Sequence, residues 1–203
     1  MIKVSARPRW HRLSTYAGRM ASAGEASQLR PARRTERRRT ARILLLDPDG
    51  RVLLFEDSDP GLPGPPTFWI TPGGGVDDGE TVEQAAIREV GEETGLVLDP
   101  AMLRGPIAHR SVVHAYSDKI VEQDETYFVV EVAPFVVDVA GHTMEEQTTF
   151  IGHRWWDRDE IVSTSARVWP TSLAALLSAA EQPETWPVTI DDAEESTVSV
   201  AED

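Results

Sequence analysis

The chain contains no cysteine among its 203 residues, so disulfide bonds, thiolate metal sites and cysteine nucleophiles are excluded. It lacks any apolar run near the ~18 residues that a membrane-spanning helix needs, and no short apolar stretch near its start resembles a secretory signal. Hydrophobic residues make up 40% of the chain, enough for one ordinary domain with its own core. We therefore expect a cytoplasmic protein without membrane contact.

Positive charge is scarce except at the start of the chain, and the net charge of −14 hides three different regions. Residues 1–42 carry a net charge of +10, residues 43–181 a net charge of −17, and residues 182–203 seven acidic residues with no basic one. A body this acidic is poorly suited to binding nucleic acid through its phosphates. The basic segment 1–40 is the only candidate for such a contact.

Three parts of the chain are expected from these patterns. Residues 1–40 have little apolar periodicity and a cluster of arginines, which predicts a basic, disordered arm. A contact with nucleic acid or a protein partner and a transit peptide are the alternative interpretations of this arm. Residues 41–181 carry the apolar runs and turn signals of a folded domain. Residues 182–203 are expected to form an acidic, disordered tail.

The domain is expected to have a mixed α/β fold, because short strand-like runs surround one long helix. Asp-Gly at 49–50 predicts a β-hairpin, and the loop 58–67, with four prolines, is long enough to border a substrate pocket. Thr81 with Gln84 predicts a capping box at the helix start, and Gly95 a C-terminal cap. The expected strands are 43–46, 52–55, 68–71, 107–116, 126–132 and 150–156, and the expected helices are 80–94 and 172–180.

Carboxylates dominate one face of the long helix. Glu89, Glu92 and Glu93 continue the apolar stripe that begins at Val82, whereas a solvated acidic face would lie opposite it. Three carboxylates on one partly buried face repel one another and lose hydration, so a bound cation explains them best. Ligands that are all oxygen favour Mg²⁺ or Mn²⁺, which is commonly shared with substrate phosphates.

Three glycines, Gly73, Gly74 and Gly75, precede this helix and let the backbone approach a ligand closely. No Gly-Lys-Ser/Thr follows them, so they do not form a phosphate-binding loop of the Walker type. The segment 74–96, GGVDDGETVEQAAIREVGEETGL, resembles the signature of the Nudix hydrolase family, with every specified position filled. With softer similarity outside this segment, the resemblance spans residues 41–181.

The resemblance implies a Nudix fold, which is a mixed β-sheet sandwiched between α-helices and carries a loop–helix–loop motif. It implies Mg²⁺-dependent hydrolysis of a diphosphate linkage in a nucleoside diphosphate derivative, with a small nucleotide as partner and a homodimer as a plausible assembly. The alternative is a regulatory protein that binds a nucleotide ligand on the same fold without turnover. Such proteins usually lose a glutamate of the signature, and this chain has lost none.

The family's roles carry over onto matching positions. The metal ligands that the resemblance implies are Glu89, Glu92, Glu93 and the carbonyl of Gly74. Glu80 would hold a metal ion or its water, and Arg88 would orient the carboxylates through ion pairs. The carboxylate that deprotonates the attacking water varies within the family. Glu93 and Glu125 are the leading candidates, Glu125 because it precedes an apparent inner strand, and Glu145 and Glu146 are weaker ones.

Substrate binding is expected at Trp69 and at the three glycines. For Trp69, packing in the core is the alternative, since the residue lies in a strand. A nucleotide sugar, ADP-ribose, a dinucleotide and a damaged nucleoside triphosphate all remain possible substrates, because that choice depends on loops outside the signature.

Overall fold

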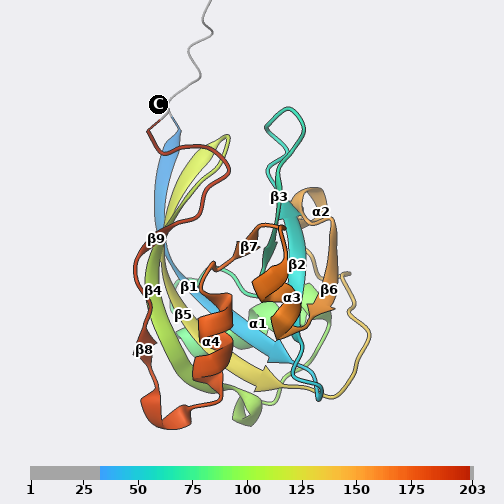
Figure 1. The fold of residues 1–203 in the computed structure, drawn as a ribbon. Helices are drawn as coiled ribbons and strands as arrows, with labels where there is room; N and C mark the ends of the chain where they lie inside the picture. The colour runs from blue at the N-terminus through green and yellow to red at the C-terminus, as the bar shows by residue number, and fades with distance from the viewer. Residues whose placement is uncertain (1–32, 202–203) are drawn as a thin grey trace, which may run out of the picture. The chain divides into compact units, whose positions relative to one another are not determined.

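The computed structural model describes residues 33–201, so most of the expected basic arm lies outside the described residues (Figure 1). The described chain has the mixed α/β architecture that the sequence predicts. Its strands are β1 Arg34–Leu46, β2 Val52–Ser58, β3 Thr67–Ile70, β4 Arg104–Ala115, β5 Lys119–Glu131, β6 Gly152–Trp156, β7 Val168–Trp169, β8 Val188–Thr189 and β9 Ala193–Glu194. Its α-helices are α1 Val82–Thr94, α2 Glu146–Thr149, α3 Arg158–Ser163 and α4 Leu173–Ala180, with short 3₁₀ turns at Pro100–Met102 and Pro183–Thr185.

The strands of the described chain form one mixed sheet in the order β7-β3-β2-β1-β5-β4-β8, in which β6 also pairs with β2 and β9 with β4. Strand β1 runs parallel to β5 along its whole length, from Arg34 opposite Lys119 to Leu46 opposite Glu131. It is antiparallel to β2 where Leu46 meets Val52, which confirms the hairpin predicted at 49–50. Strands β1, β5 and β4 form a long, curled unit (Figure 1), and the described residues begin and end close together there, since the Arg33 side chain donates to the Ser199 carbonyl at 2.9 Å.

Helices cover both faces of the sheet, as expected for a sandwich. Alternate residues of β1 point to opposite sides, so Ile43 packs with α1 and Leu44 packs with α4. Figure 1 shows α4 in front of the sheet and α1 behind it. Each face therefore has its own apolar core, and α1 is held by buried Ala85, Ala86 and Val90.

Local signals fix both ends of α1. The Thr81 hydroxyl accepts a hydrogen bond from the Gln84 backbone N–H, and the Gln84 side chain accepts one from the Thr81 N–H, which confirms the predicted capping box. Gly95 ends the helix at φ 72°, a left-handed conformation that glycine adopts without strain. The motif helix therefore starts and stops where the sequence predicts.

Two expectations of disorder are wrong within the described residues. Residues 34–40 are not a flexible arm but the first half of β1, because acidic groups of the neighbouring strand offset the arginines, as in the ion pair between Arg37 and Asp124. Residues 182–201 are not a disordered tail, since β8 and β9 both pair with β4. Alternate apolar side chains, Trp186 and Val188 among them, pack against the α4 core and hold this segment in place.

Within residues 33–201, none of the helices has the length and apolar character needed to traverse a lipid bilayer.

Candidate functional site

The loop before α1 forms a backbone ladder with β1. The Ile43 N–H donates to the Pro72 carbonyl at 2.9 Å, and the Ala41 N–H donates to the Gly74 carbonyl at 3.0 Å. Gly73 has φ 127°, and a Cβ there would lie 2.1 Å from the Ala41 carbonyl oxygen. Only glycine allows the two backbones to lie this close, so the loop runs directly beside β1 before the chain enters α1.

A second glycine lies against a carboxylate. A Cβ on Gly74 would come within 2.5 Å of the Glu89 Oε1 atom, whereas a Cβ on Gly75 would meet nothing nearer than the Arg38 Cδ at 3.9 Å. Gly74 therefore leaves the space that the Glu89 carboxylate occupies. Of the three glycines predicted to bind substrate, Gly73 and Gly74 contact the acidic cluster, and Gly75 lies at its edge.

Three carboxylates converge beside this loop. Glu89, Glu93 and Glu146 each place an oxygen so that all three atoms lie within 4.8 Å of one another. Burial and the neighbouring Glu89 raise the pKa of Glu93 well above its ordinary value, although the Gly73 N–H donates to its Oε2 at 2.9 Å. Burial also raises the pKa of Glu89, against the influence of Arg88. Several negative charges close together in a site that is partly shielded from solvent are suited to binding a divalent cation.

Glu146 reaches this cluster because its loop is docked on the C-terminal end of α1. The Asp138 N–H donates to the Thr94 carbonyl at 2.9 Å, and the His142 Nε2 donates to the Glu93 carbonyl at 3.0 Å. Gly141 lies so close to α1 that a Cβ would come within 2.4 Å of the Glu92 carbonyl oxygen. The loop thus delivers an acid from outside the motif to the motif's own carboxylates.

Arg88 binds the remaining acids of the motif. Its guanidinium donates to both oxygens of Glu80 at 3.0 Å, to Glu89 at 2.7 Å and to Glu92 at 3.0 Å. Hydrogen bonds from Arg88 lower the pKa of Glu80. This is the carboxylate-orienting geometry that the sequence predicts for Arg88. The Glu92 side chain is 43% exposed and turned toward Arg88, outside the group formed by Glu89, Glu93 and Glu146.

Glu125 lies elsewhere, in a buried ion-pair network. Its Oε1 accepts from the Arg42 Nε at 3.0 Å, and its Oε2 accepts from the Arg110 Nε at 2.7 Å and from the Tyr127 hydroxyl at 2.5 Å. Burial alone would raise the pKa of Glu125, but the two arginines outweigh it and lower the pKa to about 2. A carboxylate so stabilised is a poor proton acceptor, so the geometry does not favour its predicted role as base.

Trp69 is part of the core on the α4 face. Its ring lies edge to face with that of Trp156, 5.0 Å between centroids, and Arg154 lies over both rings. It packs with residues of the α4 cluster, whereas Glu89 and Glu93 belong to the helix on the opposite face. The core interpretation of Trp69 thus agrees with the structure better than substrate binding does.

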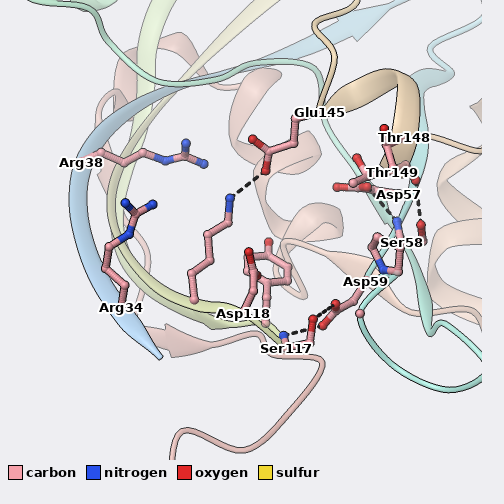
Figure 2. A pocket seen from close by; sticks show the side chains of 14 residues that line it. Arg34, Arg38, Asp57, Ser58, Asp59, Ser117, Asp118, Glu145, Thr148 and Thr149 are labelled. Carbon is pink, nitrogen blue, oxygen red and sulfur yellow. Dashed lines mark hydrogen bonds and ion pairs between the residues drawn. The ribbon is translucent and has the colours of Figure 1, made fainter. Parts of the chain in front are cut away.

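A cavity of about 590 Å³ lies between the first half of β1, the end of β2 and α2 (Figure 2). Arg34 and Arg38 of β1 form one wall, and Asp57 and Glu145 lie across from them. Glu145, which lines this cavity, immediately precedes Glu146 of the cluster, whereas Glu89, Glu93 and Glu146 themselves do not line it. The proline-rich loop contributes part of the lining at its start, as expected for a loop that borders a pocket.

The cavity has mixed charge. Lys119 donates to Glu145 at 2.7 Å, whereas Arg38 forms no hydrogen bond or ion pair with any residue in the range 33–201. Burial raises the pKa of Asp57 to about 6. Sequence reasoning missed Arg38 and ranked Glu146 low, because only the pairing of β1 with β5 and the docked loop place them here.

A model of the NUDIX domain matches residues 36–177. The chain is 45% identical over 56 residues to an RNA pyrophosphohydrolase of Sphingopyxis alaskensis, covering 28% of this chain and 33% of that protein. It is 32% identical over 97 residues to an ADP-ribose pyrophosphatase of Methanocaldococcus jannaschii, covering 48% of each. The matches thus span only a third to a half of these curated relatives.

Among solved structures, a MutT protein of Methanosarcina mazei superposes with a TM-score of 0.49 at 19% identity, covering 76% of this chain and 99% of that one. An Ap4A hydrolase of C. elegans superposes with a TM-score of 0.48 at 20% identity, covering 71% and 95%. The domain match extends over well over half of the chain and includes the loop, the helix and the carboxylates described above. The chain belongs to the NUDIX family.

Proposed function

We propose that this chain is a metal-dependent pyrophosphohydrolase that cleaves a diphosphate linkage in a small nucleoside diphosphate derivative. The observation that carries the proposal is the cluster of Glu89, Glu93 and Glu146, and the residue before Glu146 lines a cavity of about 590 Å³. The names of the relatives, RNA pyrophosphohydrolase and ADP-ribose pyrophosphatase, support the same class of reaction. A homodimer, cytoplasmic location and a nucleic-acid contact by residues 1–40 stay predictions.

The carboxylate cluster fits a hard divalent cation, because its ligands are all oxygen and two of them, Glu89 and Glu93, are buried. Glu89 and Glu93 would hold Mg²⁺ or Mn²⁺ with Glu146 close beside them, and Arg88 would keep Glu89 in place. When bound, the ion supplies a Lewis acid that offsets phosphate charge and lowers the pKa of water. Glu92 and the Gly74 carbonyl, which already accepts the Ala41 N–H, remain predicted ligands on the periphery.

Glu146 is the best-placed general base. It comes from a loop rather than from α1, it is only partly buried, and its Oε2 accepts the Thr143 N–H at 2.7 Å, which leaves Oε1 for a water molecule. Glu93 is 2% exposed and bound to the Gly73 N–H, a position better suited to holding a ligand than to exchanging protons with solvent. Glu146 therefore replaces Glu125 as the proposed loop acid.

The cavity would receive the substrate. Its volume falls within the range of small-molecule pockets. Arg38 has a guanidinium without a partner among the described residues, beside Gly75 of the motif loop, where it can bind a phosphate oxygen. Arg34 and Lys119 add positive charge at the same wall. The phosphates would thus lie between Arg38 and the carboxylates, with the rest of the substrate in the cavity.

The proposal is tested by measuring nucleotide and phosphate release from a panel of nucleoside diphosphate derivatives and triphosphates with Mg²⁺ or Mn²⁺. We expect metal-dependent turnover that Glu146→Gln lowers on the order of 10²–10⁴-fold, as for loss of a general base. Glu93→Gln should lower turnover and metal affinity together. Glu83→Gln, at an exposed position of the same helix, is the matched control and should change neither.

Two results would contradict the proposal. Turnover that is unaffected by chelation or by Glu93→Gln would exclude the carboxylate cluster as the reaction centre. A wild-type chain that turns over no compound, but whose melting temperature rises with one of them, would favour the alternative of a nucleotide-binding regulatory protein.

A further inference from the structure

A chain of buried charges crosses the α4 face of the sheet, outside the motif. Arg42 pairs with Glu125 at 3.0 Å, Glu125 with Arg110 at 2.7 Å, and Arg110 with Glu195 through two bonds of 2.9 and 2.8 Å. All four residues are buried. Removing charged groups from water costs several kcal/mol per ion, so good geometry alone does not explain why such a chain is kept here.

The far end of this chain belongs to the C-terminal segment. Glu195 follows β9, and its carboxylate also accepts the Thr171 N–H at 2.7 Å, while its backbone carbonyl accepts the His114 Nδ1 at 2.6 Å. Both carboxylate oxygens and the backbone carbonyl of Glu195 therefore accept hydrogen bonds. The residue lies beyond the matched family region 36–177, so the domain match does not account for it.

The near end of the chain reaches the motif loop. Arg42 Nη1 donates to the Gly73 carbonyl at 3.0 Å and lies 3.4 Å from the Thr71 carbonyl. These two carbonyls flank the Pro72–Gly73 peptide, whose N–H donates to Glu93 Oε2 at 2.9 Å. Arg42 thus donates to the carbonyls on both sides of the Gly73 N–H, and this N–H donates to Glu93.

We propose that Arg42 is a positioning residue for Glu93, and that Glu125, Arg110 and Glu195 hold the Arg42 side chain in place. The C-terminal segment, which carries Glu195, thereby helps to set the geometry of the carboxylate cluster. Gly73 needs this support because its φ of 127° is reached without a side chain to lock it. The inference rests on the proposed assignment of Glu93 as a metal ligand. It adds a dependence on Arg42 and Glu195, which touch none of the three clustered carboxylates.

The test compares two variants at opposite ends of the chain with one control in the full-length protein. Arg42→Lys keeps a positive charge near Glu125 but loses the planar group that binds Glu125 through Nε and the Gly73 carbonyl through Nη1 at the same time. Glu195→Gln keeps the size of the side chain and removes its charge. Glu194→Gln changes the neighbouring, exposed acid of β9 in the same way and is the matched control.

Three quantities are measured: the ¹H–¹⁵N shift of the Gly73 amide without metal, the affinity for Mn²⁺ alone, and kcat with KM. We expect both variants to move the Gly73 amide shift, to weaken Mn²⁺ binding and to lower kcat about tenfold to a hundredfold with little change in KM, since small misplacements of a reacting group cost rates of this order. Glu194→Gln should match the wild type in all three.

A purely structural role makes a different prediction. If both variants melt at lower temperature yet keep the wild-type Gly73 shift, Mn²⁺ affinity and kcat, the inference is overturned. If Arg42→Lys does not fold, Glu195→Gln decides alone, because it lies far along the chain from the loop. The amide shift and Mn²⁺ affinity need no turnover, so they test the inference even if the proposed hydrolysis fails.

Discussion

Buried glutamates of this protein have opposite proton affinities because their neighbours differ. Glu93 is buried beside another carboxylate, and its pKa is raised well above the ordinary value. Glu125 is equally buried, yet Arg42 and Arg110 lower its pKa to about 2. The first therefore attracts protons or a cation, whereas the second is an anion at neutral pH. Burial alone would not have distinguished the two roles.

This difference predicts how stability depends on pH. The pKa of Glu125 is lower in the folded protein than in the unfolded chain, so its contribution to the free energy of unfolding is present above pH ~4.5 and is lost as the pH falls toward 2. Glu125→Gln should lower the free energy of unfolding at pH 7 by about 3 kcal/mol, because it leaves two buried arginines short of a partner.

The measurement is urea denaturation at several pH values, with Glu122→Gln on the exposed face of the same strand as the control. The difference between wild type and Glu125→Gln should shrink in acid, while Glu122→Gln should stay within about 0.5 kcal/mol throughout. A difference that is small at pH 7, or that grows on acidification, would contradict the ion-pair account.

Among the elements, the loop and helix of the motif were predictable because their signals are local. The capping box at Thr81, the stop at Gly95 and the stripe of glutamates all depend on residues within one or two helical turns. The three glycines could be assigned to a close approach, but the sequence does not say what each one approaches. The structure separates them by what a Cβ would meet, which is the Ala41 carbonyl of β1 at Gly73, the Glu89 carboxylate at Gly74, and only the Arg38 Cδ at 3.9 Å at Gly75.

Gly74→Ala should therefore disturb the carboxylates more than the fold. Its Cβ would displace the Glu89 carboxylate, a movable side-chain end, from the position in which Arg88 holds it. We expect Mn²⁺ affinity to fall on the order of tenfold with a change in the free energy of unfolding below about 1 kcal/mol. Gly75→Ala, at an ordinary φ and with room for the methyl group, is the control for Mn²⁺ affinity. Equal losses of affinity in both variants would contradict the steric argument.

Elements that depend on distant partners were not predictable. The alternating apolar residues Trp186, Val188 and Ile190 were assigned to an acidic tail, because no residue near them in sequence indicates that they pack against α4. The arginines of residues 34–40 were predicted to repel one another, because the sequence does not show that β5 places acidic residues opposite them. Glu146 could be named only as a weak candidate, because a four-residue helix has little periodicity, and the contacts of its loop with α1 are long-range.

At the scale of the whole molecule, the proposed function requires an acidic protein to bind an anionic substrate. The net charge of −14 repels phosphates at long range, so local positive charge at the cavity decides binding. That charge comes from β1, whose first half extends beyond the motif loop and lines the cavity with Arg34 and Arg38. The segment that looked like a separate basic arm is thus part of the proposed binding site.

Arg38→Gln should raise KM for the best nucleotide substrate about tenfold at low ionic strength, because a charge-assisted hydrogen bond to phosphate is worth on the order of 1.5 kcal/mol or more. We expect kcat to change little, since Arg38 lies at the cavity rather than among the carboxylates. The wild-type KM should rise with added salt, and this dependence should be weaker in the variant. Steady-state kinetics at several salt concentrations measure both effects.

Arg37 provides the matched control, because it is the next residue on the same strand and loses the same charge when changed to glutamine. Its guanidinium already pairs with Asp124 at 3.1 Å and does not line the cavity. If long-range attraction by the basic strand governs binding, Arg37→Gln and Arg38→Gln should raise KM equally, because screening acts on net charge. If direct phosphate contact governs it, only Arg38→Gln should do so. Among residues 33–201 Arg38 has no hydrogen-bond or ion-pair partner, and this favours the second outcome, since a guanidinium without such a partner at a cavity wall gains most from a phosphate.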